Sequence, residues 1–111
     1  MKVREERDGD IVVLEPEGRI DSTTAPVLGE QLTAVLAARG TRLVLDFRSL
    51  EYISSAGFRV LLLAAKHAEL AGSRLVLCGI TGKVRQIFEL AGFLDLLPLY
   101  TSREESVASL R

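Results

Sequence analysis

Hydrophobic and polar residues follow two kinds of pattern along the chain, and each kind predicts a different element. Short apolar or alternating runs predict five strands, at Val3–Arg7, Ile11–Leu14, Leu43–Phe47, Arg74–Cys78 and Leu94–Tyr100. The first two runs are separated by Asp8-Gly9-Asp10, and an Asp-Gly pair in that position is typical of a β-hairpin. The domain is therefore expected to open with an antiparallel hairpin.

Apolar residues recur at helical spacing in the segments between and after these runs. Four helices are predicted: from near Thr24 to the stop at Gly40, over Ala56–Ala71, from Thr81 to Gly92, and from the capping box Ser102–Glu105 onward. The second has strong helix formers and few polar positions, so we expect it to be largely buried.

The predicted order of elements is ββαβαβαβα. Strands that alternate with helices are joined by right-handed crossovers and form a mostly parallel sheet, which the opening hairpin makes mixed. A chain of 111 residues is too short to divide into two domains. We expect one α/β domain over residues 1–111, with about five strands and about four helices.

Charge and hydropathy exclude several kinds of partner. Fourteen basic and fifteen acidic residues give a net charge of −1, and the basic residues are scattered, which argues against nucleic acid or an anionic membrane surface. The longest apolar run, Val60–Ala65, is far shorter than a membrane helix, and residues 1–10 are too charged for a signal peptide. The expected location is the cytoplasm.

Residues that commonly carry catalysis are sparse. Cys78 and His67 are the only residues of their types, which excludes an internal disulfide and a zinc cluster. Gly79–Lys83 lacks the spacing of a phosphate-binding Walker loop. Glu15 and Glu17 are expected to be ordinary solvated charges. The sequence therefore predicts no enzyme, no metal and no cofactor held by this chain.

The segment Tyr52–Phe58 lies between a central strand and a helix. A serine at the carboxyl end of a parallel strand, beside a helix N-terminus, is exposed at the edge where open α/β folds bind ligands. Ser54 or Ser55 can also serve only as the helix N-cap. The spacing alone leaves both interpretations open.

Three segments, Gly18–Asp21 followed by Thr24, Val44–Phe47 and Tyr52–Leu62, resemble the STAS domain of bacterial anti-sigma factor antagonists. The resemblance spans nearly the whole chain. It implies a mixed sheet with helices packed on it, as the predicted order does independently. It also implies that a serine at the start of the second helix is phosphorylated by a partner anti-sigma factor, which is itself a serine/threonine kinase.

The resemblance assigns the site residue by residue. Ser55-Ala56-Gly57 matches the family's phosphorylated serine and the glycine two residues later, so Ser55 is the implied phosphorylation site. Ser54 stands where many members have aspartate and remains the alternative acceptor. The implied partner-binding residues lie in two segments: Asp21, Ser22, Thr23 and Thr24, and Ser54, Ala56, Gly57, Phe58 and Arg59.

The function implied by the resemblance is that of a switch. The unphosphorylated domain binds the kinase and releases a sigma factor, phosphorylation of Ser55 ends that binding, and a serine phosphatase reverses it. The alternative is a non-switching STAS scaffold subunit of a stress-sensing or lipid-transport complex. A phosphate-accepting receiver domain centred on Asp46 is a third reading, but Asp8 and Asp10 lie in the hairpin turn rather than after the first strand.

Overall fold

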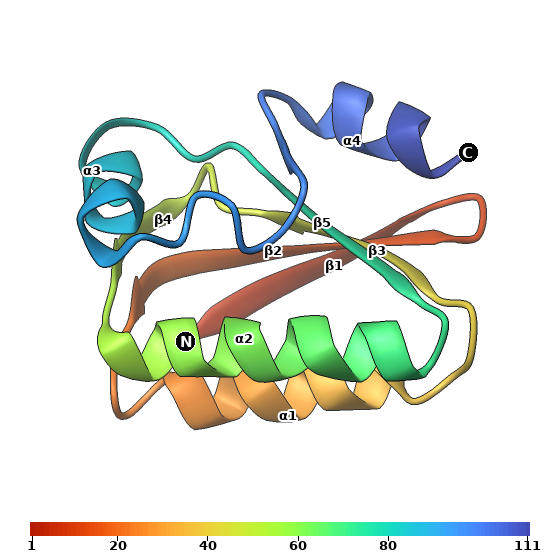
Figure 1. Cartoon of the computed structure of the whole chain (residues 1–111), viewed down its shortest axis with the longest axis horizontal. Helices are drawn as coiled ribbons and strands as arrows, with labels where there is room; N and C mark the ends of the chain where they lie inside the picture. The colour runs from red at the N-terminus through yellow and green to blue at the C-terminus, as the bar shows by residue number, and fades with distance from the viewer.

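Six strands and four helices make up the computed structural model, which describes all 111 residues (Figure 1). In chain order they are β1 (Lys2–Asp8), β2 (Ile11–Ile20), α1 (Ala25–Leu36), β3 (Arg42–Asp46), β4 (Leu50–Ile53), α2 (Ser55–Leu70), β5 (Arg74–Cys78), α3 (Gly82–Ala91), β6 (Leu99–Tyr100) and α4 (Arg103–Leu110). The α/β class, the opening hairpin and the four helices are as predicted.

The strands form one mixed sheet in the order β1-β2-β3-β5-β6, and β4 pairs separately with β2. Only β1 is antiparallel to its neighbour, with Asp8 opposite Ile11 across the hairpin turn. The first half of β2 pairs in parallel with β3, and its last residues pair in parallel with β4. The predicted mostly parallel sheet is thereby confirmed.

β2 is longer than predicted, and β4 was not predicted at all. The strand predicted to end at Leu14 continues to Ile20, because its second half finds a new partner in β4. The register shifts at Gly18, which adopts φ +88°, and the Gly18 N–H donates to the Ser49 carbonyl at 3.1 Å. A four-residue strand containing the exposed Glu51 gives little pattern to detect.

β6 is shorter than predicted, because only Leu99 and Tyr100 of the Leu94–Tyr100 run pair with β5. The residues before them form turns, in which Leu96 N–H donates to the Phe93 carbonyl at 3.2 Å. Pro98 has no N–H to donate, which is tolerated at the end of the sheet. Its carbonyl accepts a hydrogen bond from the Leu77 N–H at 2.9 Å.

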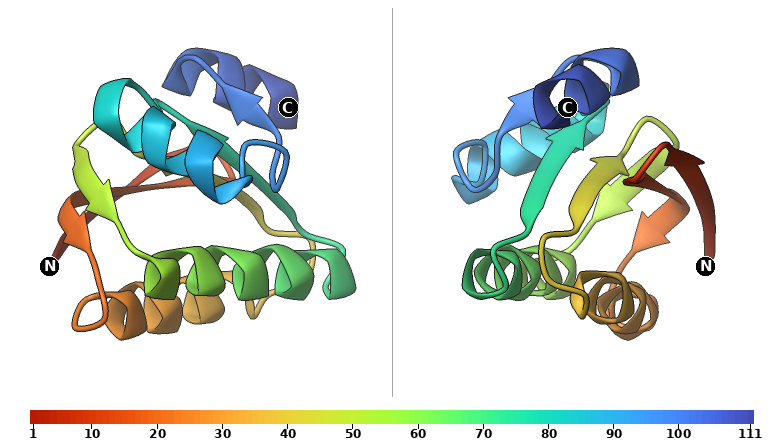
Figure 2. Two further views of the ribbon diagram at one scale, coloured as in Figure 1. Left: turned by 60° about the vertical axis from the view of Figure 1, so that its left-hand side comes forward. Right: turned by 90° about the vertical axis from the view of Figure 1, so that its right-hand side faces the viewer.

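The two faces of the sheet are covered unequally, as Figure 2 shows. Helices α1 and α2 lie side by side on one face and enclose most of a cluster of 21 buried residues, while α4 lies on the other face. Phe88 of α3 joins the larger cluster, with its ring centre 6.2 Å from that of Phe47 and 4.9 Å from that of Phe58. This aromatic group fixes the end of the domain where α2 begins.

The prediction that α2 is largely buried is wrong. One stripe is buried, formed by Gly57, Phe58, Leu61, Ala64 and Ala68, whereas Leu62, Leu63 and Leu70 are exposed. The sheet and α1 cover only part of the helix, and composition alone does not show which part. No helix has both the length and the apolar character needed to cross a membrane.

Glu15 also differs from its prediction as a solvated charge, because it is only 5% exposed. Its carboxylate accepts a hydrogen bond from the Ser49 hydroxyl at 2.6 Å and pairs with Arg48 at 3.3 Å and with Arg103 at 2.5 Å. These partners, Ser49 foremost, lower the pKa of Glu15 although burial opposes them. A buried charge is tolerated here because it is paired on every side.

We expect Glu15 to make stability depend on pH. A carboxyl whose pKa is lowered by folding stabilises the protein fully above the unfolded value of about 4.5, and this contribution is lost as the pH falls through the folded value. The wild type should therefore be more stable than Glu15→Gln at about pH 7, and the difference in their unfolding free energies should shrink as the pH is lowered to about 3. Denaturant titrations over that range measure it.

The matched control is Glu51→Gln, which removes an exposed carboxylate and should leave the unfolding free energy nearly unchanged. A gap between wild type and Glu15→Gln that stays constant with pH contradicts the role assigned to Glu15.

Candidate functional site

The predicted site residues come together because β2 and β4 are parallel neighbours that end at the same place. Ile20 pairs with Ile53, and the Ser54 N–H donates to the Ile20 carbonyl at 2.8 Å. The connection from β2 to α1 and the connection from β4 to α2 therefore emerge beside each other, as Figure 1 shows at one end of the domain. Segments more than thirty residues apart in the chain thus share one edge of the sheet.

The structure gives Ser54 and Ser55 different roles. Ser54 has extended backbone angles and is the N-cap of α2, with its hydroxyl accepting a hydrogen bond from the Gly57 N–H at 3.4 Å. Ser55 is the first residue of the helix, is exposed, and its hydroxyl makes no hydrogen bond within the chain. The cap interpretation therefore applies to Ser54 and leaves the Ser55 hydroxyl free.

The loop that faces this pair is built around Asp21. Its Oδ1 accepts hydrogen bonds from the Thr23 hydroxyl at 2.7 Å, the Thr23 N–H at 3.0 Å and the Thr24 N–H at 3.2 Å. These bonds, those of Thr23 first, hold the pKa of Asp21 below its usual range. Asp21 therefore keeps a fixed negative charge at the entrance to α1.

Thr24 is the N-cap residue of α1, but its side chain makes no capping hydrogen bond. Its hydroxyl accepts from the Asp21 N–H and donates to the Arg19 carbonyl, both at 2.8 Å. Instead, the Asp21 carbonyl accepts the hydrogen bond of the Ala25 N–H at 2.8 Å. The hydroxyl of Thr24 thus stabilises the loop rather than the helix.

Two residues of the predicted partner surface lie beneath it. A Cβ atom on Gly57 would stand 2.6 Å from Ile53 Cγ1 and 2.7 Å from Ile20 Cγ2, so only glycine lets α2 approach the strand ends this closely. Phe58 is 5% exposed, and its ring stacks on that of Phe93 with centres 4.6 Å apart. Both residues are buried, so they support the surface from below and do not face a partner.

The outer surface is made by the remaining members. Four are exposed, Ser22, Thr23, Ser55 and Arg59, and four are half-buried, Asp21, Thr24, Ser54 and Ala56. None of five hollows on the molecule is lined by these residues. A free hydroxyl outside these hollows suits contact with another protein better than enclosure of a small substrate.

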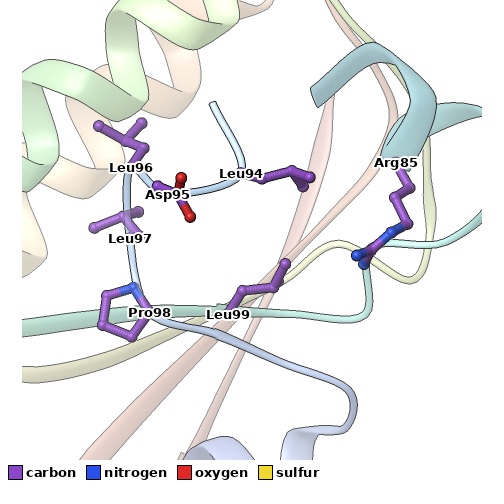
Figure 3. Close-up of a pocket in the computed structure, with 7 residues that line it drawn as sticks. All are labelled: Arg85, Leu94, Asp95, Leu96, Leu97, Pro98 and Leu99. Atoms are coloured by element: carbon purple, nitrogen blue, oxygen red, sulfur yellow. The ribbon is translucent and has the colours of Figure 1, made fainter. Parts of the chain in front are cut away.

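The largest of these five hollows lies elsewhere, between α3 and the segment that leads to β6 (Figure 3). It measures about 620 Å³ and is lined by Arg85 and residues 94–99. Figure 3 shows Leu94 and Leu99 pointing into the space and Arg85 reaching it from α3. No site residue predicted from the sequence belongs to it.

The structure also bears on the other candidate residues. Asp46 is 1% exposed and accepts hydrogen bonds from Arg103 Nε at 3.0 Å and from the Arg48 N–H at 3.1 Å, so it is not placed to receive a phosphoryl group as in a receiver domain. Burial raises the pKa of the Cys78 thiol to about 11. His67 is exposed on α2, and no three acidic, histidine or cysteine side chains gather in a way that could hold a metal ion.

Comparison with known proteins places these features in one family. A model of the STAS domain matches residues 2–106. BtrV of Bordetella bronchiseptica, named as a candidate anti-sigma factor antagonist, is 37% identical over 111 residues, which are 100% of this chain and 96% of that protein. The anti-sigma-B factor antagonist of Listeria monocytogenes is 32% identical over 94 residues, 85% of this chain and 82% of that protein.

Solved structures agree. An anti-sigma factor antagonist from Mycobacterium paratuberculosis has a TM-score of 0.80 at 26% identity, covering 99% of this chain and 93% of that chain. A candidate antagonist from Thermotoga maritima has a TM-score of 0.87 at 18% identity, covering 98% and 94%, and so shows the shared fold.

The two serines should differ in their effect on stability. Ser54→Ala removes the cap of α2 and is expected to lower the unfolding free energy by about 1 kcal/mol. Ser55→Ala removes a hydroxyl without a partner and should change it by less than about 0.5 kcal/mol. Denaturant unfolding of the two variants measures the difference. Equal losses, or a larger loss for Ser55→Ala, would show that the cap is wrongly assigned.

Proposed function

The chain belongs to the STAS-domain family of anti-sigma factor antagonists, and we propose that it works in that family as a switch controlled by phosphorylation of Ser55. In its unmodified form it binds an anti-sigma factor that is a serine/threonine kinase, and a sigma factor is released. Phosphorylation by that kinase ends the binding, and a serine phosphatase restores it. The chain itself supplies the substrate hydroxyl and no catalytic group.

The observation that carries this proposal is that Ser54 caps α2 whereas the hydroxyl of Ser55 is free. An acceptor hydroxyl must reach the active site of another protein, which a hydroxyl committed to a cap does poorly. Ser55 is exposed at the first position of α2, and its hydroxyl makes no hydrogen bond. The hydroxyl of the neighbouring Ser54 caps the helix by accepting a hydrogen bond from the Gly57 N–H. The alternative acceptor, Ser54, is half-buried and bonded.

The surroundings of Ser55 explain why a phosphate there would act on binding. Phosphorylation adds a charge of about −1.5 to −2 to a surface that already holds the fixed charge of Asp21. A complex fitted to a neutral hydroxyl offers that charge no partner on the kinase, and desolvating it there costs about 2–5 kcal/mol. The corresponding loss of affinity is about 30-fold to several thousand-fold.

The same phosphate is compatible with the fold. It lies at the N-terminus of α2, where free N–H groups and the helix dipole favour negative charge. Arg59 lies four residues further along the helix, is exposed, and has no ion-pair partner in the chain. An acidic group four residues before a basic one is the favourable order for a helical ion pair, so Arg59 can neutralise part of the added charge.

We expect incubation with the cognate kinase and ATP to add one phosphate to the wild type and none to Ser55→Ala. Ser54→Ala is the matched control and should still be phosphorylated. Mass spectrometry after proteolysis locates the phosphate, and calorimetric titration with the kinase should show affinity falling at least about 30-fold on phosphorylation. Phosphate found on Ser54 would show that Ser54 is the acceptor in place of Ser55. An affinity for the kinase that does not change on phosphorylation would favour the scaffold alternative.

We expect phosphorylation to change the melting temperature little, because the dipole and Arg59 offset the added charge. Arg59→Gln should leave the unmodified protein equally stable but lower the melting temperature of the phosphorylated form relative to phosphorylated wild type, by an amount that shrinks with added salt. Lys66→Gln, further along α2, is the matched control. A phosphorylated wild type that unfolds would contradict a mechanism based on binding alone.

A further inference from the structure

Helix α4 is the cover of the second face of the sheet. Its residues Val107 and Leu110 pack on a cluster of seven buried residues, the other five being Ile11, Val13, Val44, Val76 and Cys78 from the strands. In Figure 2, α4 lies across the face opposite α1 and α2. This eight-residue helix therefore supplies all of the helical side chains in that cluster.

Side chains alone attach α4 to the rest of the domain. No backbone–backbone hydrogen bond joins it to another element. At its C-terminal end, Arg42 donates to the Leu110 carbonyl at 3.0 Å and Arg74 donates to the Ser109 carbonyl at 3.2 Å. At its N-terminal end, Arg103 makes the ion pairs that join α4 to the strands.

Arg103 is enclosed by three carboxylates from three strand segments. Its Nε donates to Asp46 at 3.0 Å, one Nη donates to Glu6 at 2.6 Å, and the other donates to Glu15 at 2.5 Å. Its side chain is 17% exposed. All three contacts are charge-assisted hydrogen bonds, which are stronger than neutral ones, and they use both edges of the guanidinium fork.

The buried carboxylates keep other partners that do not depend on α4. Glu15 accepts from the Ser49 hydroxyl at 2.6 Å, and Arg48 pairs with Glu15 and with Asp46, each at 3.3 Å. If α4 moves away, Arg103 leaves with it, and the two carboxylates remain paired with the turn after β3. The sheet is thus not left with an isolated buried charge, which is the usual obstacle to such a movement.

We propose that Arg103 is a latch for α4, and that α4 opens as a unit while the sheet and helices α1 to α3 remain folded. Local opening of this kind is expected of an element that has few buried side chains and no backbone–backbone hydrogen bond to its neighbours. The latch lies on the face opposite Ser55, so the proposal does not rest on the phosphorylation switch.

Cys78 provides a direct reporter of this opening. It is the only cysteine of the chain, it is 0% exposed, and it lies in the same cluster as Val107 and Leu110. A thiol reagent such as dithionitrobenzoate can reach it only when its cover moves. The rate of labelling of the full chain under native conditions therefore measures how often α4 opens.

Arg103→Ala is expected to speed the labelling of Cys78 by at least about tenfold, because bonds between charged groups hold the closed state. Arg85→Ala is the matched control, since Arg85 forms an exposed ion pair with Glu89 on α3 and should leave the rate unchanged. Glu6→Gln removes one arm of the latch and should give a smaller acceleration. Labelling of Arg103→Ala at the wild-type rate would overturn the proposal.

The wild type alone also tests it, should Arg103→Ala fail to fold. Labelling in low denaturant should depend on denaturant concentration more weakly than global unfolding does, because opening of α4 exposes little surface. If Cys78 of the wild type reacts with the full denaturant dependence of global unfolding, α4 does not open separately and the proposal is wrong.

Discussion

The pairing of β2 with two parallel partners is the constraint on which the rest of the structure depends. The first half of this strand pairs with β3 and its end pairs with β4, with the change of partner at Gly18. Because β2 and β4 end side by side, the helices that follow them begin side by side. Asp21 and Ser55 are neighbours for that reason, although neither element alone determines it.

Close packing then turns this adjacency into a defined surface. Gly57 lets the first turn of α2 rest on Ile20 and Ile53, and the rings of Phe58, Phe88 and Phe93 fill the space behind it. A well-packed interior leaves little freedom for the groups that it supports. The position of the Ser55 hydroxyl is therefore set by the core beneath it, while the hydroxyl itself remains free.

The two faces of the sheet are stabilised by different interactions. On the face that carries α1 and α2, the cluster is apolar and large. On the other face, the apolar cluster is small and is joined by the buried charges of Glu15 and Asp46 and the half-buried charge of Arg103. Apolar contacts form with any suitably shaped neighbour, whereas three carboxylates around one guanidinium fit only one arrangement of α4. The packing of α4 on this face thus depends on the geometry of its hydrogen bonds as well as on the burial of apolar side chains.

The sequence by itself determined the class of fold, the hairpin and the four helices. These features follow from the spacing of apolar residues and from the residues of the turns, both of which are determined by residues close together in the chain. The resemblance to the family added the choice of Ser55, which spacing alone left open. The burial of α2 was misjudged because periodicity shows that a helix is apolar but not what covers each side.

Tertiary structure decided the features that depend on residues far apart in the chain. β4 exists as a strand because β2 is long enough to pair with it, and one partner of Glu15, Arg103, is 88 positions away. A charged residue looks the same in sequence whether it faces water or a distant arginine. Likewise, only the folded chain shows that Ser54 is bonded and Ser55 is free, because that distinction rests on where α2 begins.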